Sequence, residues 1–274
     1  MSLAQLALLS VCVTAGLCAL MAFAWRIQQA SGNSGWVDVS WTFSVGGVAC
    51  IAALAPLGED SWPNTRQLVV ASLVAAWSLR LGFHIAARTR SSGDDPRYRL
   101  LATQWGADAS RRMFWFLQSQ AAVGAILAMS VALAAQNPNP ALRIQDIAGI
   151  FVLVAALIGE AVADSQLRDF KAMAADRSVV CDVGLWRWSR HPNYFFEWLA
   201  WLAYPVIAID LSGINPWGWV ALLAPACMYW VLVHVSGIPP LESHMVRTRG
   251  EAFRSYQRRT RPFLPFPLMR RRGT

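Results

Sequence analysis

The sequence has few charged residues and lacks the motifs of soluble nucleotide-binding and metal enzymes. Asp, Glu, Lys and Arg make up 15% of its 274 residues, against about 25% in an ordinary soluble domain. No glycine-rich dinucleotide fingerprint or P-loop is present, and the four histidines form no HExxH-type motif. These absences exclude a Rossmann domain and a P-loop NTPase, and we expect no metal site.

Cysteine pairs are also missing. Four of the five cysteines, Cys12, Cys18, Cys50 and Cys227, fall within apolar runs, and Cys181 lies in a polar segment. None forms a CxxC pair, so the sequence indicates neither a disulfide framework nor a zinc site.

Long apolar runs dominate the sequence. Hydrophobic residues make up 55% of the chain, which includes 14 Trp. A membrane-spanning helix needs roughly 17–25 predominantly apolar residues. Runs of about this length cover residues 3–25, 36–57, 68–87, 113–135, 147–163, 195–211 and 217–235. The sequence therefore predicts an all-α, polytopic integral membrane protein with about seven transmembrane helices.

The cations are distributed unevenly between these runs. Nearly all Lys and Arg lie in the segments 88–112, 168–190 and 247–272, whereas Arg66 and Arg143 fall on the opposite side. Because Lys and Arg are retained on the cytoplasmic side, this pattern predicts an outside N-terminus and a cytoplasmic C-terminus. The net charge of +8 indicates contact with anionic membrane lipids and not with nucleic acid, since the cations sit in short loops beside apolar runs.

Polar side chains are concentrated at the entry to the sixth run, in the segment Gly184-Leu-Trp-Arg-Trp-Ser-Arg-His-Pro-Asn-Tyr-Phe-Phe-Glu197. Arg187 and Arg190 can hold phosphate groups, and Pro192 suits a first helical turn. Glu197 would lie about one turn inside the apolar zone, where polar groups are costly and usually functional. The segment predicts a clamp for an anionic cofactor at the membrane surface.

The fifth run carries two carboxylates on one helix face. Glu160 and Asp164 are four residues apart and would repel one another unless something separates or neutralises them. We expect them to accept hydrogen bonds from the amide or hydroxyl groups of a cofactor. The alternative is a salt bridge between Asp164 and Arg168, one turn further on.

Three polar residues in the first half of the chain are candidates for catalysis. Arg80 and His84 are one helical turn apart in the third run, as expected for a proton-donating pair directed at a carbonyl oxygen. The alternative for the histidine is a hydrogen bond to a neighbouring carbonyl. Asp38 opens the second run as a candidate substrate-orienting carboxylate, or alternatively as a charge on the helix dipole.

The end of the chain carries further candidates. Glu242 follows the break Gly237-Ile-Pro-Pro240, where the prolines end the helix. Tyr256 lies in a basic helix whose arginines either bind phosphate or reach the lipid surface. The proline-rich segment 261–267 should be extended, with its phenylalanines in the interface or over a pocket.

Three of these segments resemble the cofactor-binding elements of the steroid 5α-reductase-like membrane reductases, in a bacterial branch of that family. They are Ala163-Asp-Ser-Gln-Leu-Arg168, Gly184 to Glu197, and Tyr256 before Phe263-Leu-Pro-Phe266. The resemblance implies a single seven-helix domain, 1–274, in the bacterial cytoplasmic membrane. Its residues 146–274 would bind NADPH from the cytoplasm, and residues 1–135 would mainly form the cavity for a hydrophobic, lipid-like substrate. Hydride would pass to an activated carbon–carbon double bond.

The resemblance also implies roles for individual residues. Asp164, Asn193 and Glu197 match positions that touch the cofactor, and Arg168 and Lys171 fall near the family's phosphate contacts. The residues expected to bind the cofactor are Glu160, Asp164, Arg168, Lys171, Arg187, Arg190, His191, Asn193, Tyr194, Glu197, Glu242 and Tyr256.

The chain departs from the steroid-converting members at their substrate site. Those members use a Glu on the second span and a Tyr on the third to hold and protonate an enone carbonyl. Here His84 takes the place of the Tyr, and Asp38 is the nearest carboxylate. Imidazolium is a stronger acid than a phenol at neutral pH, so we expect His84 to stabilise the enolate, assisted by Arg80 or Asp38, with steroids not required as substrates.

Two other functions remain open. Membrane methyltransferases of the isoprenylcysteine and phospholipid type also have an Arg-His-Pro-x-Tyr element and a late Glu, which Glu242 would supply, with S-adenosylmethionine as cosubstrate. Asn193, Glu197 and the Ala-Asp-Ser-Gln-Leu stretch match the reductases better. A non-catalytic lipid-binding protein would show inverted repeats or paired broken helices, and the sequence shows neither.

Overall fold

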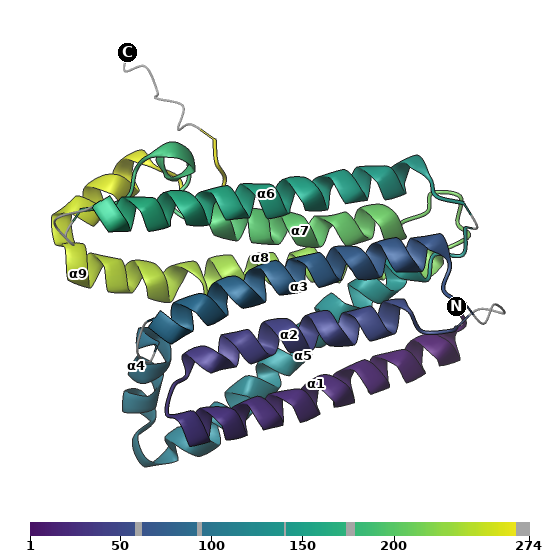
Figure 1. Ribbon diagram of the computed structural model, residues 1–274, viewed down its shortest axis with the longest axis horizontal. Coiled ribbons are helices and arrows are strands. Elements are labelled where there is room, and N and C mark those ends of the chain that lie inside the picture. The colour runs from purple at the N-terminus through teal and green to yellow at the C-terminus, as the bar shows by residue number, and fades with distance from the viewer. Residues whose placement is uncertain (58–61, 92–94, 140, 174–178, 267–274) are drawn as a thin grey trace. The chain divides into compact units, whose positions relative to one another are not determined.

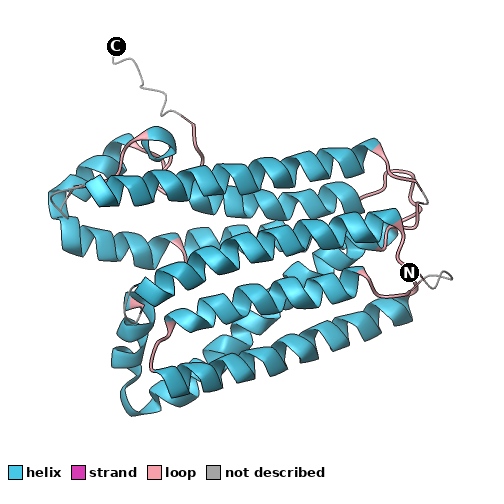
Figure 2. Ribbon diagram, viewed as in Figure 1, coloured by secondary structure: helices cyan, strands magenta, loops and turns pink. Residues whose placement is uncertain are grey.

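The protein is helical throughout the part of the chain that can be described. A computed structural model describes residues 1–57, 62–91, 95–139, 141–173 and 179–266. No strand occurs among these residues (Figure 2), although Ser189 and Arg261 pair as an isolated parallel bridge. The prediction of an all-α protein is confirmed. Parts of the predicted cytoplasmic segments, namely 92–94, 174–178 and 267–274, lie outside the described residues.

The helices are long and apolar, as a polytopic membrane protein requires. Within the described ranges, six helical segments could cross a bilayer: Leu3–Ser31, Gly35–Ala53, Thr65–Ser91, Arg97–Ala135, Ile144–Met173 and Pro216–Arg259. The run predicted at 195–211 forms α7 (Pro192–Ala208), whose 17 residues are at the lower limit for a span. It ends at Ala208, and in the turn that follows, Asp210 accepts a hydrogen bond from the Ser212 backbone N–H at 2.8 Å. The number of seven spans stays a prediction.

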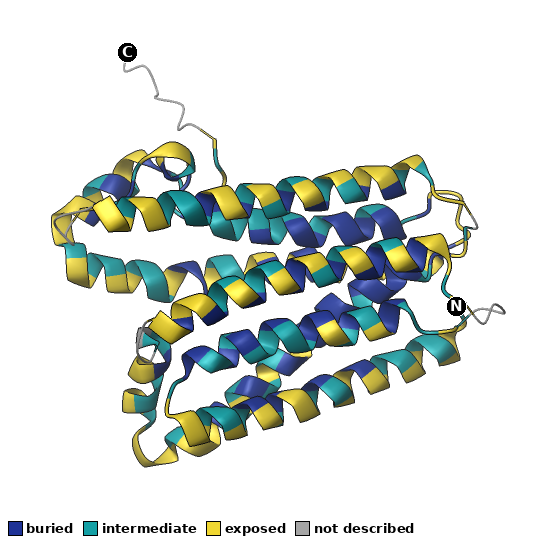
Figure 3. Cartoon of the chain, in the orientation of Figure 1, coloured by how far each residue is buried: buried dark blue, intermediate teal, exposed yellow. Residues whose placement is uncertain are grey.

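Large apolar side chains cover much of the helix surface. Phe23, Ile51, Trp115 and Phe151 are each at least 64% exposed. The helices in Figure 3 accordingly alternate buried and exposed residues along their length. Apolar side chains at this density would be unfavourable in water, so these faces indicate contact with lipid.

The chain forms two compact units. The first contains Met1–Ile150 and Leu202–Ala224, and the second contains Phe151–Trp201 and the chain from Pro225 onward. Helices α6 (Ile144–Met173) and α7 therefore contribute residues to both units.

The first unit is a bundle of α1 (Leu3–Ser31), α2 (Gly35–Ala53), α3 (Thr65–Ser91) and α5 (Ala109–Ala135), visible in Figure 1. Small residues let the helices approach closely. A Cβ atom on Gly46 of α2 would lie 2.2 Å from the Ser78 side chain of α3. The core contains fully buried Leu17, Val45, Trp77 and Leu127.

A short helix that the sequence analysis did not predict joins α3 to α5. Helix α4 (Pro96–Trp105) starts at Asp95, whose side chain accepts a hydrogen bond from the Arg97 backbone N–H at 2.9 Å, and a 3-10 turn, η1 (Gly106–Asp108), follows it. Asp followed by Pro is a helix-start signal. The many cations of segment 88–112 made it resemble a loop.

A buried ion pair joins the start of α3 to the start of α6 in the first unit. The Arg66 guanidinium lies 3.0 Å from the Asp146 carboxylate, and both side chains are almost fully buried. Arg66 also donates to the carbonyls of Asn137, Asn139 and Ala141. One cation thus provides hydrogen bonds for three carbonyls of the loop before α6.

The second unit contains the rest of α6 and α7, a 3-10 turn η2 (Gly184–Arg187), and the C-terminal helices. The 3-10 helix η3 (Pro216–Leu222), in the first unit, leads into α8 (Leu223–Trp230), which continues into a π-helical turn, η4 (Val231–Val235), and then into α9 (Ile238–Arg259). Helix α9 is sharply bent at Gly250, which has φ 53° and ψ −127°. The bend folds the second half of α9 back, so that Gln257 donates to Glu242 at 2.6 Å.

Replacing Gly250 with alanine should lower the free energy of unfolding by about 1 kcal/mol, because a residue with a Cβ atom is strained at positive φ. Open space surrounds the position, so the loss comes from the backbone and not from a clash. A denaturation midpoint in detergent measures it, with Gly47→Ala, which is also unobstructed but lies in regular helix, as the control. Equal destabilisation of both variants would contradict the assignment of strain to the bend.

Candidate functional site

Glu242 is the centre of a polar cluster in the second unit. Arg190 binds its carboxylate with two contacts, Nε to Oε1 at 2.7 Å and Nη2 to Oε2 at 3.1 Å. His191 Nε2 lies 3.0 Å from Oε1, and Gln257 donates to Oε2 at 2.6 Å. The Arg190 and Glu242 side chains are 9% and 13% exposed. A carboxylate with this many donors and so little water is held in one position.

The same arginine also binds the backbone at the end of α9. Arg190 Nη1 donates to the Gln257 carbonyl at 3.2 Å and to the Thr260 carbonyl, and its backbone N–H donates to the Arg261 carbonyl at 2.8 Å. Three of its contacts therefore go to backbone and two to Glu242. In this arrangement Arg190 organises the site from within.

Tyr256 has a similar organising position. Its hydroxyl donates to the Trp186 carbonyl and lies 3.3 Å from the Ser189 carbonyl, and the ring is 2% exposed. Ser189 Oγ in turn donates to the Phe263 carbonyl at 2.8 Å. These contacts hold the turn η2 against the segment that follows α9, in which Phe263 is buried. This segment bends at Pro262 and Phe263, and Pro267 lies outside the described residues, so its extended form stays a prediction.

His191 lies at the start of α7, where it is buried and stacked on Tyr194. The two rings are 5.5 Å apart and nearly parallel, at 14°. Burial lowers the pKa of His191, and the hydrogen bond with Glu242 raises it only in part, so that the pKa stays below its ordinary value. A neutral imidazole is therefore favoured, and in one tautomer it donates from Nε2 to Glu242.

A second polar group lies between α6 and α7. Asn193 Nδ2 is 3.5 Å from Asp164 Oδ1, and both side chains are half-buried. One turn along each helix, Glu160 and Glu197 are buried, and Trp201 donates to Glu197 Oε1 at 3.0 Å. The structure thus brings together Asp164 and Asn193, which are 29 residues apart in the sequence.

Three predicted phosphate-binding cations are exposed to solvent: Arg168, Lys171 and Arg187. Arg168 is 67% exposed and contacts Ser165 and Asp169. Arg187 lies over the Trp188 ring at 6.0 Å. All three are more exposed than Arg190.

The first unit contains a charged cluster with two residues that the sequence analysis missed. Tyr98 donates to Asp38 Oδ1 and Arg97 Nη2 donates to Asp38 Oδ2, each at 2.6 Å. Arg97 also binds Asp95, at 3.0 and 2.9 Å. Asp38 is thus a partner in a specific network and not simply a charge on the helix dipole. Recognising α4 from its Asp-Pro start would have placed Tyr98 and Arg97 on a helix, though not beside Asp38.

Asp95 remains ionised within this cluster. Burial raises its pKa, but hydrogen bonds and the charge of Arg97 outweigh burial and leave the pKa below the ordinary value. The cluster therefore combines two carboxylates with one guanidinium and one phenol. Gln120 on α5 adds an amide 3.4 Å from the Tyr98 hydroxyl.

The other predicted catalytic residues lie on α3. Arg80 and His84 are half-buried and one turn apart on this helix. The helix itself matches the predicted third run and extends it at both ends. Their proton-donating role stays a prediction.

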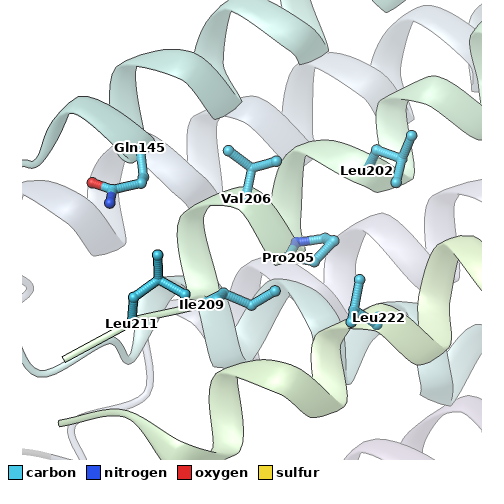
Figure 4. Close-up of a pocket in the computed structure, with 7 residues that line it drawn as sticks. All are labelled: Gln145, Leu202, Pro205, Val206, Ile209, Leu211 and Leu222. Carbon is cyan, nitrogen blue, oxygen red and sulfur yellow. The ribbon is translucent and has the colours of Figure 1, made fainter. Parts of the chain in front are cut away.

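A surface pocket in the first unit contains none of the predicted site residues. Its volume is about 270 Å³. Figure 4 shows it between the start of α6, the end of α7 near Pro205, and η3. The lining residues are Gln145, Leu202, Pro205, Val206, Ile209, Leu211 and Leu222. Its lining is apolar apart from Gln145, so it offers no catalytic chemistry.

No group of three or more His, Cys, Asp or Glu side chains suited to a metal ion occurs among the described residues.

Comparison with known proteins gives one family. The model of a protein family of unknown function, DUF1295, matches residues 24–260. No curated protein and no solved structure matches the chain.

Proposed function

The chain belongs to the DUF1295 family, and we propose that it is an NADPH-dependent membrane reductase that transfers hydride to an activated carbon–carbon double bond of a lipid. The observation that carries the proposal is the Asp164–Asn193 pair, beside exposed cations of the same unit. A carboxylate acceptor next to an amide donor is complementary to a carboxamide such as that of nicotinamide.

The residues of the second unit fit such a cofactor. Arg168, Lys171 and Arg187 would hold its phosphates, and Asp164 and Asn193 would hold its carboxamide. Arg190, His191, Glu242 and Tyr256 would keep η2 and α7 in position without touching the phosphates, because their polar groups are already bonded within the protein. When bound, NADPH supplies the hydride.

The first unit would supply the groups that act on the substrate. Arg97 and Tyr98 both donate to Asp38, and these two bonds fix the three side chains relative to one another. The single Tyr98 proton is used in its bond to Asp38, so the Arg97 guanidinium, through Nη1, is the proposed donor for a carbonyl oxygen on which negative charge develops. His84, with Arg80 one turn away, is the proposed proton donor. The apolar helices around these groups favour a hydrophobic substrate and exclude water.

We also propose that the C-terminus and the cofactor site face the cytoplasm of a bacterial inner membrane. The proposal follows from the Lys and Arg of segments 88–112, 168–190 and 247–272. Reporter fusions at both ends of the chain test it. A cytoplasmic N-terminus would contradict it.

Methyl transfer from S-adenosylmethionine is a second candidate, and one observation favours it. The residues that this chemistry would use, Arg190, His191 and Glu242, are in direct contact. The Glu242 carboxylate of this cluster would suit the cationic sulfonium of S-adenosylmethionine, and its Arg190 would suit the ligand's carboxylate. The Asp164–Asn193 pair has no evident use in that reaction.

Thermal stabilisation separates these functions, since a ligand that binds only the native state raises the melting temperature. We expect NADPH to stabilise the detergent-purified protein, and NADH to do so less. Stabilisation by S-adenosylmethionine alone would replace reduction with methyl transfer. No stabilisation by any of them would favour a lipid-binding protein without catalysis.

Asp164→Ala and Asn193→Ala should each weaken NADPH binding about five- to tenfold, the value of one hydrogen bond of about 1 kcal/mol or slightly more. Isothermal titration measures the change. Glu251→Ala is the control, because Glu251 is in the same unit but 70% exposed and pairs with Arg258, which has no part in the proposed site. Unchanged affinity in both site variants would remove the carboxamide site.

A further inference from the structure

The end of α8 carries a pair of polar rings that the proposed reaction does not use. Tyr229 is the penultimate residue of α8, and His234 lies in the π-helical turn η4 that follows. Their ring centroids are 5.8 Å apart, with an interplanar angle of 69°. Both side chains are exposed, Tyr229 by 42%.

The π-helical turn is what brings the two rings together. Five residues cover about 1.4 turns of an α-helix, so residues 229 and 234 would point in different directions in regular helix. In a π-helix the hydrogen bonds join residues five apart, and such residues lie nearly above one another. The Ser236 backbone N–H accordingly donates to the Val231 carbonyl at 2.9 Å.

Glycine makes this turn possible. A Cβ atom on Gly237 would lie 2.4 Å from the Leu232 carbonyl oxygen, closer than any side chain tolerates. Short π-helical segments are uncommon and frequently occur at functional sites. The local sequence is thus built to hold His234 against Tyr229.

Aromatic side chains surround the pair. Trp230, which is 62% exposed, lies 5.1 Å from the His234 ring. Phe263 and Trp198 pack against the other side of Tyr229, at 5.5 and 6.4 Å between centroids. Among the described residues, neither the Tyr229 hydroxyl nor the His234 ring nitrogens make a hydrogen bond. The site therefore presents donor groups on an apolar, aromatic surface.

We propose that Tyr229 and His234 form a binding site for a neutral lipid that carries a carbonyl oxygen. The phenol O–H and an imidazole N–H both donate to such an oxygen, and Trp230 supports the adjoining chain. No Lys or Arg occurs between residues 217 and 246, so the segment that carries the two rings offers no cation of its own to a phosphate. The site requires neither the cofactor nor the reaction proposed above.

Photoaffinity labelling in lipid nanodiscs without NADPH tests the site. One probe is a long-chain methyl ketone with a diazirine in its chain, and the other is a hydrocarbon of equal length with the same diazirine. We expect the ketone to label the peptide that contains residues 229–234 more strongly than the hydrocarbon does. In the double variant Tyr229→Phe, His234→Leu, ketone labelling should fall at least about fivefold, the value of one hydrogen bond, and hydrocarbon labelling should not change.

His244→Leu, which removes an exposed histidine from α9, is the matched control and should label as the native protein does. Equal labelling of the native protein by both probes would overturn the proposal and leave Tyr229 and Trp230 as interfacial anchors. The comparison of probes on the native protein remains decisive even where the double variant fails to fold. Loss of labelling by both probes in a folded double variant would also overturn the proposal, because binding would then not depend on the carbonyl oxygen of the ketone.

Discussion

Replacing Glu242 with alanine should lower the free energy of unfolding by about 3–5 kcal/mol, the usual loss when one partner of a buried ion pair is removed. The change leaves the Arg190 guanidinium, 9% exposed, with no carboxylate. It also takes the hydrogen-bond acceptor from Gln257 and from His191. Chemical denaturation of the detergent-solubilised protein measures the loss.

The control for Glu242 is Glu251→Ala on the same helix. Glu251 pairs with Arg258 at 2.6 Å, but the two side chains are 70% and 64% exposed, so water replaces the lost contact at little cost. A difference between the variants thus reports burial and not the number of charges. Equal stability of Glu242→Ala and the native protein would show that Glu242 does not form the buried ion pair described above.

This result bears on function because the Glu242 cluster fastens three segments to one another. Arg190 contributes the turn before α7, Glu242 the first half of α9, and Gln257 its second half. Two of the proposed cofactor residues, Arg187 in η2 and Asn193 in α7, depend on these segments keeping their places. We therefore expect Glu242→Ala to weaken NADPH binding as well, through lost positioning and not through a lost contact.

The positions of the helices could be predicted from the sequence better than the contacts between their polar side chains. Apolar runs of membrane length depend on local composition, and the described helices follow them closely. Arg190 and Glu242 are 52 residues apart, and Asp38 and Tyr98 are 60 apart. No local pattern states which distant polar groups will meet, so Arg190 was expected at a phosphate when it binds a carboxylate and backbone carbonyls.

Two local features escaped prediction for different reasons. Helix α4 has 10 residues in a segment rich in cations, and its helix-start signal was outweighed by that charge. The π-helical turn at 231–235 has no sequence signature beyond Gly237 and the prolines that follow it. It depends on one additional residue per turn, which leaves the apolar pattern of the span unchanged.

Asp38→Asn should reduce turnover about 10²- to 10⁴-fold, the range for a group that directs a proton or a developing charge. The native carboxylate accepts from Tyr98 on one oxygen and from Arg97 on the other. Asparagine keeps the shape but removes the negative charge opposite Arg97. Its one oxygen must face Arg97, which can only donate, so its NH₂ group faces Tyr98 and the hydroxyl has to turn and accept. Loss of NADPH absorbance with a straight-chain α,β-unsaturated methyl ketone as substrate measures the rate.

Binding and chemistry separate in this variant, because Asp38 belongs to the first unit and the proposed cofactor residues belong to the second. NADPH should therefore still raise the melting temperature of Asp38→Asn by the native amount. Asp108→Asn is the control, since Asp108 is 50% exposed and only 3.3 Å from the exposed Arg111. Native turnover in Asp38→Asn would show that the cluster serves the fold alone, and the search for the group that polarises the substrate would return to Arg80 and His84.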